Sequence, residues 1–294
     1  MAGFVQSPGI QAFTATSPTS ATLLPGPAGT SATFAYGISD TGSVVGSYTS
    51  SSGDHAFIES SGRYTTFDVP FAGAAGTFAY GINAAGSVVG FYTDAAGSGV
   101  SYVRSAAGAF SAFQFADQLA TYAYHIDDSD VVTGTYVDAG GAIAGFVKNG
   151  ASFTRYAAPA SGAVSTFVRG ANSLGDLVGN YVDALGRSTA FVRLGSAFWT
   201  LGFPGASGAV AMGINDQRQV VGYYMNGNTS TGFLALPPAP VPLPVSLPLF
   251  LAGLLALLQP LARRLRASSL PGKSDFVSSD LRSCCFAAST SPTS

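Results

Sequence analysis

Few side chains in the sequence could carry out chemistry, and most of those that could are aspartates. Asp94, Asp138 and Asp183 each follow a tyrosine by two residues, in YTDAAG, YVDAGG and YVDALG. If these phrases are equivalent loops, their carboxylates share one face and predict a ring that binds a sugar or a cation. Two facing carboxylates would also suit glycoside hydrolysis. An aspartate that only opens a turn before a glycine is the alternative.

The densest acidic cluster contains Asp127, Asp128 and Asp130. Hard oxygen ligands at this spacing could bind Ca²⁺. The same positions belong to a turn that reads NAAG or NSLG elsewhere in the chain, without the carboxylates. The cluster therefore also fits an ordinary turn, and we expect no cofactor, with Ca²⁺ as the open alternative.

The histidines and cysteines give little support to a metal or nucleophilic centre. His55 and His125 occupy different positions of the sequence repeat described below. Two histidines without further ligands make a poor metal site. Cys284 and Cys285 lie near the end of the chain, so the preceding residues have no thiol chemistry. No Gly-x-Ser-x-Gly elbow or phosphate-binding glycine loop is present. We therefore expect no catalytic residue and no enzyme.

The elements that must position these residues form a tandem repeat. One phrase, typified by TFAYGINAAGSVVGFY, occurs five times, at intervals of 44, 44, 45 and 43 residues. Its copies begin at Thr33, Thr77, Thr121, Thr166 and Ala209. A second landmark follows each copy, at Ala56-Phe57, Ser101-Tyr102, Gly145-Phe146, Ala190-Phe191 and Gly232-Phe233.

Each repeat predicts four short strands rich in Val, Tyr, Phe and Thr. A turn separates the first two, opening with Ser, Asn or Asp and ending with Gly, except where Asp130 and Arg218 predict an altered or mildly strained turn. Four strands in about 44 residues are typical of a β-propeller blade, with a β-solenoid as the alternative. The glycines of the second strand are expected to allow close packing between sheets near an axis. They are Gly46, Gly90, Gly179 and Gly222.

The N-terminus begins within a repeat. Gly3-Phe4-Val5 resembles the second landmark, and residues 11–14 resemble a fourth strand. These strands could complete the last unit, residues 209–236, which would give about five four-stranded blades. Otherwise the start is truncated, since no secretion signal is visible in the first 20 residues.

Composition excludes two classes of protein. Charged residues make up 10% of the 294-residue chain and the formal net charge is −2, which argues against the basic surface that nucleic acid requires. The 21 Phe and 13 Tyr are too many large apolar groups for a disordered chain. We therefore expect residues 1–236 to form one all-β domain.

The composition changes after residue 236. A proline-rich linker over 237–246 leads to an apolar stretch over 247–266, and a polar tail over 267–294 is expected to be disordered. The apolar stretch predicts a marginal membrane-spanning helix. The arginines that follow it, Arg263, Arg264 and Arg266, predict a cytoplasmic end by the positive-inside tendency. The repeats would then lie outside the cytoplasm.

Two resemblances agree with this placement. The C-terminal segment resembles the VPLPA branch of PEP-CTERM sorting signals, which an exosortase reads in Gram-negative bacteria. The resemblance lies in Val241, Pro242, Leu243 and Pro244, the apolar stretch and the arginine cluster. The repeats resemble extracellular HAF proteins, whose name-giving residues are His-Ala-Phe at 55–57. The resemblances imply a cell-surface or extracellular location and partnership with a membrane and an exosortase.

Taken together, the sequence favours a non-enzymatic surface protein that binds or associates with extracellular polysaccharide. A polysaccharide lyase or glycosidase that uses loop aspartates is the alternative.

Overall fold

The computed structural model describes residues 2–6, 10–17, 20–115, 117–227 and 229–236, and every regular element in these ranges is a β-strand. The strands belong to a compact unit over residues 1–237. The predicted all-β class is thus confirmed. Within the described ranges, no helix is long and apolar enough to cross a membrane. The predicted linker, hydrophobic helix, arginine cluster and tail lie outside the described residues and stay predictions.

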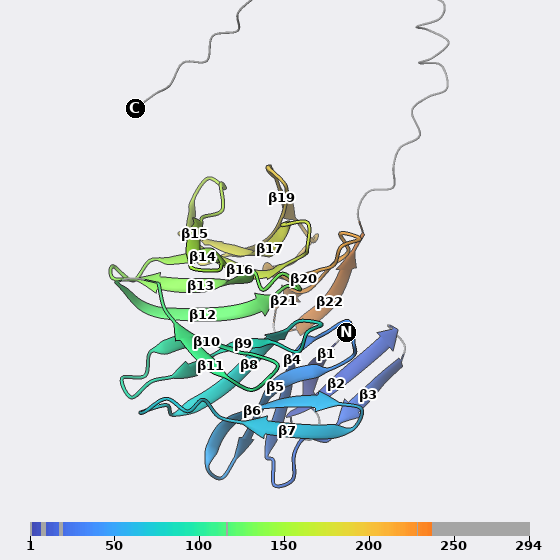
Figure 1. Cartoon of the computed structure of the whole chain (residues 1–294). Coiled ribbons are helices and arrows are strands. Elements are labelled where there is room, and N and C mark those ends of the chain that lie inside the picture. The colour runs from blue at the N-terminus through green and yellow to red at the C-terminus, as the bar shows by residue number, and fades with distance from the viewer. Residues whose placement is uncertain (1, 7–9, 18–19, 116, 228, 237–294) are drawn as a thin grey trace, which may run out of the picture. The chain divides into compact units, whose positions relative to one another are not determined.

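The strands form five hydrogen-bonded sheets, one of them eight-stranded because a single parallel bridge between Ile143 and Ser165 joins two four-stranded antiparallel halves. With these halves counted separately, six antiparallel units, called sheets below, follow one another along the chain (Figure 1). The first contains β1 (Ala2–Gln6), β2 (Ile10–Ser17) and β3 (Ser20–Leu24). The second contains β4 (Ala32–Ile38), β5 (Val44–Ser50), β6 (Gly53–Ser60) and β7 (Arg63–Phe67). The third contains β8 (Gly76–Ile82), β9 (Val88–Thr93), β10 (Gly99–Arg104) and β11 (Phe110–Phe113).

The remaining three sheets continue the pattern. The fourth contains β12 (Gln118–Ile126), β13 (Val132–Asp138), β14 (Ile143–Asn149) and β15 (Ser152–Tyr156). The fifth contains β16 (Ala163–Ala171), β17 (Leu177–Asp183), β18 (Ser188–Leu194) and β19 (Ala197–Leu201). The sixth contains β20 (Gly208–Ile214), β21 (Val220–Asn226) and β22 (Thr229–Ala235). Four sheets therefore have the predicted four strands.

Successive sheets pack face to face in chain order. The second and third strands of each sheet contact the first strand of the next, as β5 and β6 contact β8. The first strands also contact one another in series, from β4 through β8, β12 and β16 to β20. Apart from one parallel bridge between Ile143 and Ser165, the described strand pairs lie within sheets. A parallel β-solenoid would pair equivalent strands of successive coils, and the described sheets do not pair in this way.

The first-to-second-strand turn has the same hydrogen bonds in every repeat. The side-chain oxygen of its opening residue accepts the N–H of the residue four positions later, as in Asn83 and Ser87. The fourth residue of the turn has a positive φ, which favours glycine. Asp130 at 59° and Arg218 at 60° take this conformation without being glycine, so of the two alternatives these turns are mildly strained and not altered in geometry.

Both exceptional residues bind the preceding sheet. Asp130 accepts a hydrogen bond from Asn83 Nδ2 at 2.9 Å, and Arg218 Nε donates to Asp176 Oδ2 at 2.8 Å. Burial alone would raise the pKa of Asp176, but hydrogen bonds from Asn172, Arg218 and the Gly195 N–H together hold this pKa below its ordinary value. The two departures from glycine therefore join neighbouring sheets at their turns.

The second-strand glycines serve a contact within each sheet. A Cβ on Gly179 would lie 1.8 Å from the carbonyl oxygen of Phe167 on the paired first strand, and 3.2 Å from the ring of Phe191 on the third. The expectation that these glycines allow close packing between sheets is therefore corrected. That role belongs to a first-strand glycine, because a Cβ on Gly37 would lie 2.4 Å from the carbonyl oxygen of Tyr80 in the next sheet.

The predicted strand assignment at the N-terminus is wrong by one strand. Ala12 pairs with Leu24 as Ala56 pairs with Phe67, so residues 12–13 hold the second landmark and β2 is a third strand. Gly3 pairs with Phe13, which makes β1 a second strand. The first sheet therefore contains strands two to four, and the sixth contains strands one to three. Both sheets contain their own second and third strands, so they cannot combine into one four-stranded blade. They form two separate sheets instead of completing a fifth blade.

We expect Gly179→Ala to destabilise the protein, because the new methyl group must displace a backbone carbonyl. Overpacking of this kind costs about 1–3 kcal/mol or more in the free energy of unfolding. Gly202→Ala is the matched control, since a Cβ there meets nothing within 4 Å and the residue has no positive φ. Equilibrium denaturation of both variants measures the difference, and equal stabilities would contradict the proposed contact.

Candidate functional site

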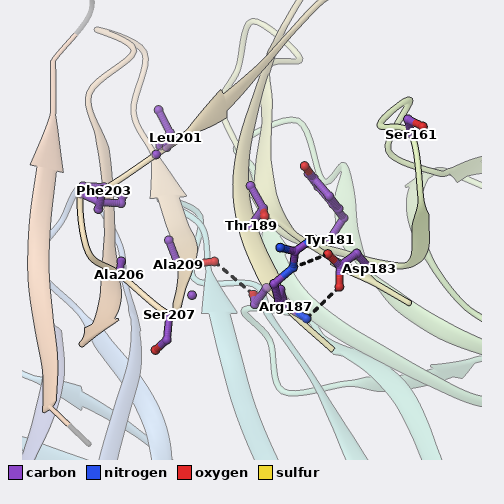
Figure 2. A pocket seen from close by; sticks show the side chains of 13 residues that line it. Ser161, Tyr181, Asp183, Arg187, Thr189, Leu201, Phe203, Ala206, Ser207 and Ala209 are labelled. Carbon is purple, nitrogen blue, oxygen red and sulfur yellow. Dashed lines mark hydrogen bonds and ion pairs between the residues drawn. The ribbon is translucent and has the colours of Figure 1, made fainter. Parts of the chain in front are cut away.

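A groove of about 420 Å³ lies between the fifth and sixth sheets (Figure 2). One wall carries Tyr181, Asp183, Arg187 and Thr189, from the end of β17, the loop after it and the start of β18. The other wall is the connection from β19 to β20, which includes Leu201, Phe203 and Ser207. The volume falls in the range of roughly 300–1,000 Å³ that small-ligand sites occupy.

The loop between β17 and β18 holds a guanidinium at the groove. Asp183 Oδ1 accepts the backbone N–H groups of Leu185 and Arg187, and Asp183 Oδ2 accepts Arg187 Nε at 2.7 Å. The hydrogen bond from the Arg187 backbone N–H lowers the pKa of Asp183 most, and the side-chain contacts of Arg187 lower it further. The Arg187 side chain is 68% exposed. Its remaining N–H groups make no hydrogen bond to any described residue and face solvent.

The neighbouring seam, between the fourth and fifth sheets, lacks an aromatic contact that other repeats have. In the fourth sheet, the ring of Tyr136 stacks on Phe115 with centroids 4.5 Å apart, and Tyr136 is only 5% exposed. Ala158 occupies the position of Phe115 in the fifth sheet, since each backbone N–H donates to the equivalent threonine hydroxyl. Tyr181, the counterpart of Tyr136, packs with Val147 and Tyr156 of the fourth sheet, is half-buried, and also borders the groove.

The opposite wall and the floor are held by packing and hydrogen bonds. Phe203 stacks on Tyr224 with centroids 4.7 Å apart, and it also packs against Phe233. Ser188 Oγ donates to the carbonyl oxygen of Ala209 at 3.1 Å and links the two sheets across the floor. The groove thus presents aromatic edges, hydroxyl groups and a guanidinium, which together suit a polar ligand with apolar faces.

The three aspartates predicted to form a ring lie in equivalent loops of the third, fourth and fifth sheets, and each is bonded within its own turn. Asp94, Asp138 and Asp183 each accept two backbone N–H groups of their own loop. No hydrogen bond among the described residues joins one of them to another. Asp183 alone lines the groove. The turn interpretation therefore accounts for all three carboxylates.

The cluster of Asp127, Asp128 and Asp130 is likewise occupied by protein groups. Asp127 accepts two N–H groups of its own turn, and Asp128 accepts the N–H of Ala84 in the preceding sheet. Within the part of the chain that the structure describes, no group of three or more His, Cys, Asp or Glu side chains is placed to hold a metal ion. These carboxylates instead join the third and fourth sheets.

The two histidines have different environments. His125 replaces a first-strand glycine, and its buried Nε2 has no hydrogen-bond partner among the described residues. Burial lowers the pKa of His125, and the charges of Asp127 and Asp128 oppose the shift. His55 instead contacts Ser52 and Asp68 through its two ring nitrogens. This contact was not predicted from the sequence. The observed pairing of Ala56 with Phe67 explains it, because the same register places residue 55 opposite residue 68.

The groove residues were also missed, except for Asp183. A usable signal was present in the repeat alignment at Arg187, because residues 98 and 142 at the same loop position are Ser and Ala. Departures from the repeat, rather than its recurring residues, mark this site.

Comparisons with known proteins give only distant likenesses. No family model matches the chain, and no curated protein matches it. Among solved structures, a lectin from Aleuria aurantia described as a six-bladed β-propeller with a novel fucose recognition mode has a TM-score of 0.43 and 12% identity, covering 80% of this chain and 90% of its own.

Two further solved structures are similar at the same level. SapL1 lectin, solved with α-methyl fucoside, has a TM-score of 0.47 and 11% identity over 82% of this chain and 96% of its own. AofleA from Arthrobotrys oligospora has a TM-score of 0.46 and 10% identity over 79% and 84%. Likenesses at this level do not establish a shared ligand.

Protonation of His125 is expected to destabilise the fold. Because its folded pKa lies below the unfolded value of about 6.5, the unfolded chain binds more protons, and stability falls as the pH drops below about 6.5. His125→Gly, which restores the residue found at Gly37 and Gly81, should flatten this dependence. Thermal melts between pH 7.5 and 5 measure it, and parallel curves for both proteins would contradict the prediction.

Proposed function

We propose that this protein is a cell-surface or secreted propeller-type repeat protein that binds extracellular polysaccharide, a role that requires no catalysis. The groove between the fifth and sixth sheets is the observation that carries the proposal. Sugar rings have apolar faces that pack on aromatic side chains, while their hydroxyl groups bond to planar polar groups. Tyr181 and Phe203 provide the first kind of surface, and Arg187 provides the second.

A rigid frame with variable loops supports the binding role. The loop that carries Arg187 is fixed by three hydrogen bonds to Asp183, so the guanidinium is held near its binding position before a ligand arrives. Such preorganisation reduces the entropy lost on binding. Loops placed on a packed scaffold are common positions for binding residues.

The proposed cellular location rests on the sequence that follows the described residues. The segment that begins at Val241, with Pro242, Leu243 and Pro244, would be the sorting motif. The apolar stretch would enter the membrane, and Arg263, Arg264 and Arg266 would remain on the cytoplasmic side. An exosortase-type enzyme would be the processing partner. Extracellular polysaccharide is a ligand class that such a location would make accessible.

Arg187→Ala should weaken polysaccharide binding by about 10-fold or more, because hydrogen bonds from a charged group contribute about 1.5–3 kcal/mol. Affinity electrophoresis of the full chain in gels containing neutral or uronate-rich exopolysaccharides measures the effect.

The matched control for this experiment is Arg155→Ala. Arg155 is an exposed arginine on β15 in the fourth sheet, so its removal changes the net charge equally. Equal losses in both variants would indicate non-specific electrostatic attraction. Absence of retardation of the wild-type chain by every polysaccharide would contradict the binding role itself.

Mapping of the chain termini in fractionated cells tests the proposed cellular location. Fractionation of the native cells followed by mass spectrometry should find the repeats outside the cytoplasm, with a new C-terminus near Pro242–Pro244. A full-length chain that retains Ser294 in the cytoplasm would overturn the sorting proposal. It would leave the binding measurement above unaffected, because that experiment uses the full chain.

A further inference from the structure

Three side chains at the edge of the second sheet form a continuous hydrogen-bonded chain. Ser52 Oγ lies 2.8 Å from His55 Nε2, and His55 Nδ1 lies 2.9 Å from both carboxylate oxygens of Asp68. Ser52 belongs to the loop between β5 and β6, His55 lies at the start of β6, and Asp68 directly follows β7. A hydroxyl, an imidazole and a carboxylate in this order are the parts of a base-activated nucleophile.

The hydrogen-bond pattern sets the role of each ring nitrogen. Because Nδ1 of His55 faces a carboxylate, Nδ1 carries the proton and Nε2 keeps a lone pair. Nε2 therefore accepts the hydroxyl proton of Ser52. Ser50 completes the pattern, since its Oγ lies 2.8 Å from Ser52 Oγ and accepts the backbone N–H of Ser52 at 3.1 Å. Ser52 is thus oriented from two sides.

The site is accessible yet ordered. The imidazole of His55 packs near the ring of Tyr48, with centroids 5.2 Å apart, and its side chain is 18% exposed. The Asp68 side chain is 56% exposed, and Ser52 is exposed at the loop. An attacking hydroxyl at such a position can reach an acyl group carried by a large polymer.

The arrangement is not a requirement of the repeat. Residues 100, 144 and 189 occupy the position of His55 in the next three sheets, and they are Val, Ala and Thr. Residues 114, 157 and 202 occupy that of Asp68, and they are Gln, Ala and Gly. The combination of a serine, a histidine and an aspartate is therefore specific to the second sheet among these four.

The equivalent positions at another seam line the groove. Thr189 and Gly202 correspond to His55 and Asp68, and both border the space between the fifth and sixth sheets. Tyr181 of the groove likewise corresponds to Tyr48 beside His55. The Ser52 site therefore lies at the same place in its own repeat, on the same edge of the sheets.

We propose that Ser52, His55 and Asp68 hydrolyse esters, with O-acyl groups of an extracellular polysaccharide as the substrate class. The choice of polymer rests on the proposed binding function, whereas the hydrolytic chemistry does not. Ser52 and His55 are the catalytic residues, and Asp68 is a positioning residue that holds the imidazole.

The reaction needs only water as co-substrate. Ser52 Oγ bonds to the ester carbonyl carbon as its proton passes to His55 Nε2, and the resulting tetrahedral species expels the alcohol, which takes that proton. Water then adds to the acyl-serine, giving one proton to Nε2. Cleavage of the bond between the acyl carbon and Oγ releases the acid, and the proton returns to Ser52. One ester and one water give one acid and one alcohol.

Hydrolysis of p-nitrophenyl acetate by the full chain, together with labelling by a fluorophosphonate, tests the proposal. Ser52→Ala and His55→Val should each lower the rate at least 100-fold, because general-base catalysis contributes about 10²–10⁴. Valine already occupies the position of His55 in the third sheet, which protects folding. Asp68→Asn should lower the rate and shift its pH profile, whereas a purely structural change would leave the profile in place.

Ser51→Ala is the matched control, since Ser51 is an exposed serine on the same loop and should retain the full rate. Mass spectrometry should place the fluorophosphonate on Ser52. A label elsewhere, or equal rates for wild type and Ser52→Ala, would overturn the proposal. Failure of the binding function is distinguished by the affinity electrophoresis of the wild-type chain, because retardation by polysaccharide without p-nitrophenyl acetate hydrolysis would overturn only the hydrolytic proposal.

Discussion

The contact between a first-strand carbonyl oxygen and a second-strand glycine is the constraint on which the rest of the described fold depends. At the glycines of the second to sixth sheets, an added Cβ would lie between 1.8 and 2.1 Å from that oxygen. The first strand carries a β-bulge at the same point in each of these sheets, as between Ala35 and Gly37. A bulge bends a strand and increases its twist, and the glycine leaves space for the displaced backbone.

This constraint explains the packing between sheets. The bend directs the bulged side chain toward the next first strand, where the rings of Tyr36 and Tyr80 stack with centroids 4.2 Å apart. The third-strand aromatic ring, exemplified by Phe57, covers the glycine and is fully buried. Small residues such as Ala56 and Ala79 then meet between the sheets. One repeated sequence therefore specifies the bend in the first strand, the buried aromatic ring of the third strand and the packing between neighbouring sheets.

Much of this frame could be predicted from the sequence, because it recurs. The repeat length, the four strands and the opening residues of the turns all follow from local propensity and spacing. The N-terminal assignment failed because Gly3-Phe4 and Ala12-Phe13 both resemble the second landmark, and only strand pairing distinguishes them. The glycine contact was misplaced because no sequence pattern states whether a close neighbour lies in the same sheet or the next.

The candidate sites were harder to predict because they depend on single departures from the repeat. The recurring aspartates Asp94, Asp138 and Asp183 attract attention as a set, yet a residue that recurs at a turn is used by that turn. Arg187, and the combination of Ser52, His55 and Asp68, each occur once among the compared repeats of this chain, so the fold of the other repeats forms without them. In a tandem repeat, recurrence therefore indicates a structural role, and a chemically distinct substitution at a seam indicates a functional one. The same rule connects the groove and the Ser52 site, which occupy equivalent places in different repeats.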